Sequence, residues 1–416
     1  MVSAAYILSV FAAASAVIAG PFPLVARAAN SSCTANTSPK AAAQPNAKAI
    51  YLLTNDAAGN SIVALKVAAD GTLSDGSITP TGGNGASGTD GKTKAPAAPD
   101  ALFSQSALKV EGSMLVAVNA GSNTLTMMTI APDDPTKLTM VGRPVDTLGE
   151  FPVSVALSGK NSLACVANTG AKAGLACFDA DPKKGLTPLS QSLIEFPLGQ
   201  STPPVGPGNT VSQTLFNEDQ SMLLTTVKGD PTKNTTGFLS TLPIPDGCPA
   251  AKDTRSSPPG TALLFGSAIV PGPKNKTTLF ATDASFGAAT ISLPHPPSSP
   301  HLLARTPIPH QKASCWAAIS PLTKTAFVTD VAVNHLVEID PATGDLKQSV
   351  LLPNANPGMI DLVAAGRMVY ALSPGTVGEG KANVVVVDVG GERIRQVQVF
   401  ELGGVGSSAQ GLAVLV

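Results

Sequence analysis

The stretch ASCWAAISPLTKTAFVTD (313–330), followed after four residues by HLVEIDPATGDL (335–346), decides the fold that the sequence predicts. It contains three apolar runs rich in Ala, Val, Ile and Phe, and the segments between and after them contain Pro, Lys, Asn and Gly. β-Branched and aromatic residues favour strands, whereas Gly, Pro and Asn favour turns. The stretch therefore predicts three consecutive strands joined by tight turns.

The same unit recurs along the chain. In each of seven copies an apolar strand ends in Asn, Asp or a similar residue, a turn follows, and a second apolar strand comes after it. Short strands repeating in units of about 50 residues are typical of propeller blades, which hide most strand edges. We therefore predict an all-β protein, a seven-bladed β-propeller over residues 48–416. The first strands of the hairpins end at Asn55, Asn119, Asn168, Val227, Asp283, Asp330 and Ser373, with a mean spacing of 53 residues.

A further apolar segment precedes most of these hairpins and is expected to be the innermost strand of its blade. The first hairpin has no such segment before it, but AQGLAVLV (409–416) has the same pattern. We therefore predict that the C-terminal strand completes the first blade, with a frayed tail as the alternative. The preceding segments are QSALKV (105–110), VSVALS (153–158), SQTLFN (212–217), SCWAAIS (314–320) and GMIDLVAAG (358–366).

The N-terminus carries a run of apolar and small residues over positions 4–19. It is shorter than the ~20 residues of a bilayer span, and small residues follow it at spacings that suit signal peptidase. We predict a signal peptide over residues 1–19, with cleavage as late as residue 28 left open, and a Ser/Thr/Asn/Ala-rich leader over residues 20–47. An uncleaved signal anchor is the alternative. The expected location is secreted, either extracellular or in a cell wall.

The cysteines and sequons agree with an oxidising compartment. Cys165 and Cys177 flank a Gly-containing turn and are predicted to pair across a hairpin, two buried thiols being the alternative. A second bridge between Cys248 and Cys315 is left open, and Cys33 completes an odd total of five. Predicted glycosylation sites are Asn30, Asn36, Asn234 and Asn275.

Composition excludes several classes of function. Charged residues make up 13% of the chain, about half the usual ~25%, and the net charge is −1. A nucleic-acid partner is therefore not expected, because it would require a basic surface. No metal-binding spacing and no cofactor motif stands out, so neither a metal nor a cofactor is expected. Gly83-x-Gly85-x-x-Gly88 lies among Ser, Thr and Pro and is interpreted as a flexible inter-blade loop.

Four segments carry a resemblance to a known family. The chain resembles the lactonase-type seven-bladed propellers and, among them, secreted fungal proteins that are similar to 3-carboxymuconate cyclase. That resemblance implies an intramolecular lyase or lactonase that interconverts a 3-carboxymuconate-like polyacid and its lactone. The segments are PDALFSQSAL (99–108), FPVSVALSGKNSLACVAN (151–168), NTVSQTLFNEDQSMLLTTVKG (209–229) and ASCWAAISPLTKTAFVTD (313–330).

Such a reaction needs cations for the carboxylates and an acid for the developing carbanion. The candidate catalytic residues are Lys228, His310 and Lys312, expected in loops at one mouth of the central channel; for each of them a solvated loop residue is the alternative. Asp283 and Asp330 could instead close turns by accepting backbone N–H groups. The residues expected to line the channel are Gln105, Asn119, Asn168, Gln213, Asp283, Asp330 and Trp316.

Two functions remain open from the sequence. The first is a secreted or cell-wall glycoprotein that acts as a binding and antigenic protein, with a matrix or glycan ligand. The second is the lyase or lactonase acting on a small polyacid. The secretory signal favours the first, because intermediates of aromatic catabolism are normally intracellular. Propellers often serve as binding platforms, and function must be argued from a site and not from a fold. In either case a monomer is expected, with no membrane association after cleavage of the signal.

Overall fold

The computed structural model describes residues 46–190, 192–273, 276–294, 299–375 and 381–416. These residues belong to the compact unit Ser32–Val416. The predicted signal peptide, most of the leader, Cys33, Asn30, Asn36 and Asn275 lie outside the described residues. Within the described part of the chain, no helical segment has the length and apolar character that a bilayer span needs.

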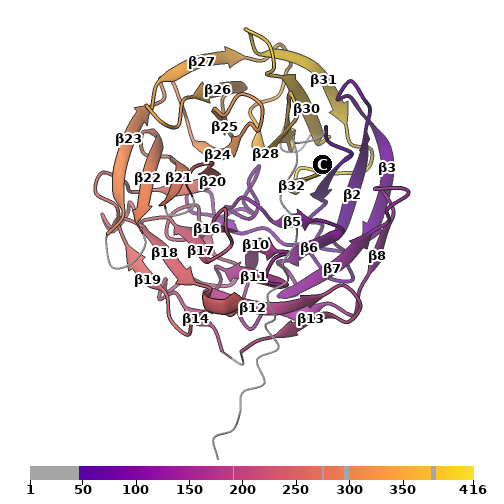
Figure 1. Ribbon diagram of the computed structural model, residues 1–416, viewed down its shortest axis with the longest axis vertical. Helices are drawn as coiled ribbons and strands as arrows, with labels where there is room; N and C mark the ends of the chain where they lie inside the picture. The colour runs from indigo at the N-terminus through magenta and orange to yellow at the C-terminus, as the bar shows by residue number, and fades with distance from the viewer. Residues whose placement is uncertain (1–45, 191, 274–275, 295–298, 376–380) are drawn as a thin grey trace, which may run out of the picture. The chain divides into compact units, whose positions relative to one another are not determined.

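Seven antiparallel sheets form the blades of a β-propeller, as the sequence predicts (Figure 1). Five sheets have four strands, and two carry a short fifth strand on the third one. From the innermost strand outward, blade 1 contains β32 (Gln410–Leu415), β1 (Ala49–Leu53), β2 (Ser61–Val67) and β3 (Leu73–Pro80). Blade 2 contains β5 (Leu108–Glu111), β6 (Met114–Asn119), β7 (Thr124–Ile130) and β8 (Leu138–Met140), with β9 (Val145–Asp146) on β7. Blade 3 contains β10 (Pro152–Ser158), β11 (Leu163–Asn168), β12 (Gly174–Asp181) and β13 (Gly185–Pro188), with β14 (Ile194–Glu195) on β12.

The remaining four blades follow the same plan. Blade 4 contains β16 (Val211–Phe216), β17 (Met222–Val227), β18 (Phe238–Pro243) and β19 (Thr254–Ser256). Blade 5 contains β20 (Leu264–Val270), β21 (Lys276–Asp283), β22 (Gly287–Pro294) and β23 (His301–Pro307). Blade 6 contains β24 (Ser314–Ile319), β25 (Ala326–Asp330), β26 (His335–Ile339) and β27 (Leu346–Leu351). Blade 7 contains β28 (Ile360–Ala365), β29 (Met368–Ser373), β30 (Asn383–Asp388) and β31 (Arg395–Glu401). A parallel pair, β4 (Thr89–Asp90) with β15 (Val205–Gly206), and the short 3₁₀ helix η1 (Pro245–Gly247) lie outside the blades.

The C-terminal strand closes the ring. β32 pairs antiparallel with β1, and the register places Ala49 opposite Leu415 and Ile50 opposite Val414. The prediction that the last strand completes the first blade is therefore confirmed. Burial follows from this arrangement, because the inner strands are covered on both faces by neighbouring blades; every residue of β1, β11 and β30 is buried.

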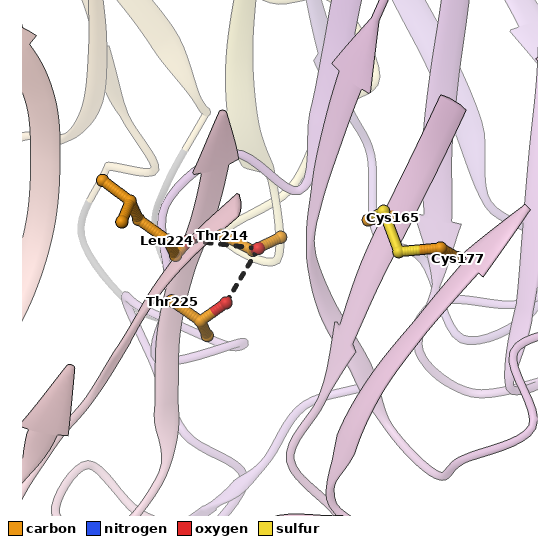
Figure 2. The surroundings of a disulfide bond; sticks show 5 residues. All are labelled: Cys165, Cys177, Thr214, Leu224 and Thr225. Atoms are coloured by element: carbon orange, nitrogen blue, oxygen red, sulfur yellow. Dashed lines mark hydrogen bonds between the residues drawn. A yellow bond between two sulfur atoms is a disulfide. The ribbon is translucent and has the colours of Figure 1, made fainter. Parts of the chain in front are cut away.

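The predicted disulfide is present. Cys165 on β11 lies directly opposite Cys177 on β12, and the two sulfur atoms are bonded (Figure 2). Cys248 and Cys315 are both free thiols, so the second bridge that the sequence left open does not form. Cys315 is buried in innermost strand β24, whereas Cys248 lies just after η1 near the outside of blade 4.

Most of the innermost strands contain a β-bulge near the end at which the chain enters them. The register shifts between Val211 and Gln213 in β16, and between Ser314 and Trp316 in β24. It shifts between Ile360 and Leu362 in β28. A bulge adds one residue to a strand and re-aims the side chains next to it. As a result, side chains next to a bulge, such as that of Asp361, do not point where the regular alternation of a strand would place them.

Candidate functional site

One end of the central channel is closed by residues 81–107, which we call the cap. The cap runs from blade 1 to blade 2 and bonds to strands on the far side of the ring. The Trp316 indole N–H donates to the Ser104 carbonyl at 3.0 Å, and the Gln105 side-chain amide donates to the Ala317 carbonyl at 2.8 Å. These contacts join positions 212 residues apart in the chain. The cap is therefore part of the propeller's interior.

The glycine-rich part of the cap is tightly packed. A Cβ atom on Gly85 would lie 2.2 Å from the backbone of Asn55, and one on Gly88 would lie 2.4 Å from the ring of Phe103. These glycines are needed because backbone and ring approach them closely. The stretch lies between blades 1 and 2, as expected of an inter-blade loop, and its glycines allow close packing there.

Lys228, the first predicted catalytic residue, is buried beneath the cap. Its ammonium donates to the Phe103 carbonyl at 2.7 Å and to the Ser212 hydroxyl at 2.8 Å, and it lies 4.2 Å from the centre of the Phe265 ring. Burial lowers the pKa of Lys228 and raises the pKa of the nearby Asp100 carboxyl, and the attraction between their opposite charges offsets part of both shifts. Lys228 thus fastens the cap to blade 4.

The other two predicted catalytic residues have different surroundings. The side chains of His310 and Lys312 are exposed. The Lys312 backbone N–H donates to the Asp330 carboxylate at 2.8 Å, so the interaction of this segment with Asp330 runs through its backbone. A shared catalytic role for Lys228, His310 and Lys312 stays a prediction.

Asp283 and Asp330 end β21 and β25, and their carboxylates bond mainly to nearby backbone. Asp283 accepts the N–H groups of Ala262 and Leu263, and Asp330 accepts those of Lys312 and Ala313. This is the turn-closing role that the sequence offered as an alternative.

The side chains of Asn119 and Asn168, the two asparagines predicted to line the channel, also contact nearby protein groups. The Asn119 side-chain oxygen accepts from Asn60 of blade 1 and from Thr81 at the start of the cap, which ties blade 2 to both. The Asn168 side-chain amide makes long contacts of 3.4–3.5 Å with the carbonyls of Gly174 and Thr147. Ligand binding by these positions remains a prediction.

A cavity of about 360 Å³ occupies the rest of the channel, and residues from the innermost strands of all seven blades line it. Gln105 and Gln213, which the sequence predicted to line the channel, lie at its floor with Ser106 and Ser267. Trp316 lies deeper, bonded to the cap. A volume of this size is in the range of small-molecule sites.

The cap and the floor side chains satisfy the strand edges at the closed end. The Val155 N–H donates to the Ser106 carbonyl at 2.9 Å. The Ala317 N–H donates to the Gln105 side-chain oxygen at 3.0 Å, and the Ser267 N–H donates to the Gln213 side-chain oxygen. An innermost strand pairs on one side only, so its other edge needs such partners.

Two residues further along each of these innermost strands, away from the cap, the free edge of the strand faces the cavity. In an antiparallel edge strand, the backbone groups that point away from the neighbouring strand recur every second residue. The bond at the end of the ladder fixes the alternation: the Ser320 N–H donates to the carbonyl of Thr325, which directly precedes β25, so the backbone groups of the preceding Ile319 point the other way. We call these cavity-facing N–H and C=O groups the amide collar. Its residues, all lining the cavity, are Leu157, Phe216, Ile269, Ile319, Ala364 and Val414.

Charge in the cavity is sparse and balanced. The charged residues among its lining are Lys109 and Glu111, both on β5. Lys109 is exposed and Glu111 is half-buried. Side chains two residues apart on a strand lie on the same face. The polar lining of the cavity is therefore mostly uncharged, with one ammonium and one carboxylate. Beside the backbone groups of the collar, it contains the side chains of Gln105, Ser106, Gln213, Thr214, Asn217, Gln220 and Ser267.

Asp361 is a buried acid just behind the floor. It is 2% exposed, and its carboxylate accepts the Ser106 N–H at 3.1 Å and the Leu362 N–H at 2.9 Å. Burial raises the pKa of Asp361 to about 7, while bonds from Ser106, Leu362 and Leu412 oppose this shift. Sequence reasoning missed Asp361, although an acid inside the apolar run GMIDLVAAG was a usable signal.

No metal centre is evident in the described ranges, where no group of three or more His, Cys, Asp or Glu side chains is placed to hold an ion. The cavity lining offers one carboxylate, and hard cations prefer several oxygen ligands.

Solved structures of other propellers resemble this one. A candidate 6-phosphogluconolactonase of Bacteroides fragilis matches with a TM-score of 0.59 at 12% identity, over 91% of this chain and 100% of that chain. The periplasmic gluconolactonase of Pseudomonas aeruginosa matches with a TM-score of 0.58 at 16% identity, over 88% of this chain and 99% of that chain. A candidate 6-phosphogluconolactonase of Bacteroides uniformis matches with a TM-score of 0.54 at 17% identity, over 70% and 82%.

At these identities the likeness shows the fold alone, a seven-bladed β-propeller. No protein-family model and no curated protein matches the sequence.

Proposed function

We propose that this protein is a lactonase-type enzyme that binds a small, uncharged lactone in the central cavity. The observation that carries the proposal is the amide collar, which gives a dead-ended cavity a ring of neutral hydrogen-bonding groups. Hydroxyl and carbonyl groups of a lactone suit such a ring. The gluconolactonase names of the fold neighbours are consistent with this class of substrate.

The polyacid substrate that the family resemblance implies fits the cavity less well. A 3-carboxymuconate carries several carboxylates and would require several cations. Lys109 is the cation that lines the cavity, and the ammonium of Lys228 is bonded to Phe103 and Ser212 under the cap. The proposal therefore favours a neutral lactone, with the polyacid as an outcome to be tested.

Within this proposal Glu111 is the general base. It takes a proton from a water molecule as the water oxygen adds to the lactone carbonyl carbon. The ring C–O bond then breaks, the proton passes to the departing alkoxide, and the product is a hydroxy acid. Collar N–H groups would stabilise the oxyanion, and Lys109 would attract the carboxylate product.

Location outside the cytosol is part of the proposal. The disulfide between Cys165 and Cys177 supports it, because such bonds persist mainly in oxidising compartments. Asn234 lies in an exposed turn, so its sequon is accessible. Secretion and glycosylation would be tested by sequencing the N-terminus of the mature protein and by mass measurement before and after glycosidase treatment.

The test of the activity uses the purified chain with glucono-1,5-lactone and with 3-carboxy-cis,cis-muconate. Acid release by the first and loss of ultraviolet absorbance by the second are followed against the spontaneous rates. We expect turnover of the lactone, and a loss of about 10²–10⁴-fold in kcat for Glu111→Gln. Turnover of the muconate alone would favour the polyacid. Turnover of neither would overturn the enzyme and favour a binding propeller.

A further inference from the structure

Ser106 holds an unusual backbone conformation at the floor of the cavity. Its φ is +66°, in the left-handed region, where a residue with a Cβ atom is strained by about 1–3 kcal/mol. The residue is half-buried and lines the cavity. Such strain persists only where the surroundings over-determine the conformation.

Three hydrogen bonds hold Ser106. Its N–H donates to the Asp361 carboxylate at 3.1 Å, and its carbonyl accepts the Val155 N–H at 2.9 Å. Its hydroxyl oxygen accepts from the Gln213 side-chain amide at 3.1 Å. Three separate elements, β28, β10 and β16, therefore fix this one serine.

The hydroxyl of Ser106 differs from the neighbouring hydroxyls because it donates no hydrogen bond to another protein group in the described part of the chain. Ser154 donates to the Gln105 carbonyl at 2.7 Å, and Ser267 donates to the Gln213 side-chain oxygen at 3.1 Å. Ser106 accepts a hydrogen bond from Gln213, which leaves its own hydrogen to be donated. Since Ser106 lines the cavity, that hydrogen is available to a ligand there.

Asp361 is well placed to hold Ser106 and costly to keep buried. Its own φ is +42° at the bulge of β28, and both carboxylate oxygens accept backbone N–H groups. The backbone of Leu412 in β32 also favours the ionised form of the carboxylate, so groups of blade 1, blade 7 and the cap all act on Asp361. The charged group that faces it from the cap is Asp100, whose like charge disfavours ionisation of Asp361.

We infer that the Ser106 hydroxyl donates to the carbonyl oxygen of the bound ligand, and that Asp361 is the positioning residue that holds Ser106 for this contact. This inference rests on the proposed lactone site. It specifies which ligand atom lies at the floor: the oxygen on which negative charge develops when water adds to the carbonyl carbon. The inference extends to any small carbonyl compound of the same shape, such as the lactam analogue.

The contact depends on the ionised form of Asp361. A carboxylate accepts at both oxygens, whereas a carboxylic acid carries a hydrogen on one of them, and that hydrogen would face an N–H donor. Because burial raises the pKa of Asp361 to about 7, the arrangement is lost as the pH falls through neutrality. Activity should therefore rise with pH on its acidic side through about pH 7.

The experiment compares the full-length mature protein with Ser106→Gly, Ser106→Ala and Asp361→Asn. Glycine accepts a φ of +66° without strain, so Ser106→Gly removes the hydroxyl while the backbone conformation stays accessible. Ser349→Ala is the control, because Ser349 is an exposed serine on the outermost strand β27. The readouts are kcat/KM for glucono-1,5-lactone between about pH 5 and pH 9 and calorimetric binding of the corresponding lactam.

We expect both Ser106 variants to lower kcat/KM by about 10²-fold or more with an unchanged pH profile. Asp361→Asn should lower kcat/KM and remove the acidic limb near pH 7. Ser106→Gly with wild-type kcat/KM, in a protein that Glu111→Gln inactivates, would overturn the inference and leave the proposed function intact.

If the wild type hydrolyses no lactone, the proposed function fails and binding decides the inference. Weaker lactam binding by Ser106→Gly than by Ser349→Ala would then support it. Equal binding, or none to the wild type, would overturn it.

Discussion

The two ends of the central channel are built from the same innermost strands but complete the edges of those strands differently. At the capped end, the N–H groups of Val155 and Ala317 bond to the cap. At the other end, Leu157 and Ile319 on the same strands line a cavity. A propeller channel therefore has two ways to complete its strand edges. The protein supplies the partners at one end, and in our proposal a ligand supplies them at the other.

The largest expected effect comes from breaking the capped end. Lys228→Met should destabilise the fold by about 3–5 kcal/mol, because it leaves the enclosed Asp100 without its counter-charge and the Phe103 carbonyl without its donor. Denaturant unfolding measures this loss. The double variant Lys228→Met with Asp100→Asn should recover part of it, and equal stability of single variant and wild type would show that the pair does not hold the cap.

The second effect is a pH dependence of stability. The pKa of Asp361 is raised to about 7 in the folded protein from an ordinary value near 3.8, so folding favours the protonated form. Its contribution to stability is therefore fully present below about pH 4 and is lost as the pH rises to about 7, a total of roughly 4 kcal/mol. Urea unfolding across this range should show the fall, and Asp361→Asn should flatten it. An identical slope in both proteins would contradict the assignment.

The sign of this effect is opposite to that expected for activity. Acid conditions stabilise the fold and weaken the floor, whereas neutral conditions do the reverse. A buried acid that costs stability at the working pH is common at functional sites.

The third effect is a loss of stability that should affect both ends of the channel alike. Replacing Cys165 and Cys177 by Ala removes a crosslink between residues 12 apart, and a loop of that size contributes about 3 kcal/mol. Because the bond joins two strands inside blade 3, we expect lower overall stability with unchanged lactam affinity. A change in affinity with intact stability would show that blade 3 shapes the cavity more directly.

The smallest effect is expected at the open end. Lys109 is exposed, so Lys109→Met should change stability by less than about 0.5 kcal/mol. Its proposed role is to attract the carboxylate product, so the change should appear in product inhibition. A stability loss as large as that of Lys228→Met would remove the distinction between the two ends.

The ring could be predicted from the sequence because each blade is a local repeat of strands and turns. One innermost strand escaped this reasoning. In β20 (LFGSAIV) a glycine interrupts the apolar run, and the structure explains it: a Cβ on Gly266 would lie 2.0 Å from the Gln105 side-chain oxygen. The glycine makes room for a residue of the cap.

The site was predicted less well because it depends on contacts between residues far apart in the sequence, which a local repeat does not indicate. Gln105 and Gln213 were found because they lie in the repeat, but the partners of Gln105 are 212 residues away. The cap could not be predicted, since nothing local indicates that a loop crosses to the opposite side of the ring. Asp361 was missed because the bulge of β28 shifts it out of the alternation that sequence spacing follows.

The closing strand β32 has one more consequence. Leu412 of this strand lines the cavity, and its backbone acts on the carboxylate that holds Ser106, so the floor of the cavity is complete only when β32 has paired with β1. In our proposal, ligand binding therefore requires that β32 has paired with β1. A chain truncated before residue 410 could retain six intact sheets and give a nearly native circular dichroism spectrum, yet the ligand would distinguish it from the finished molecule.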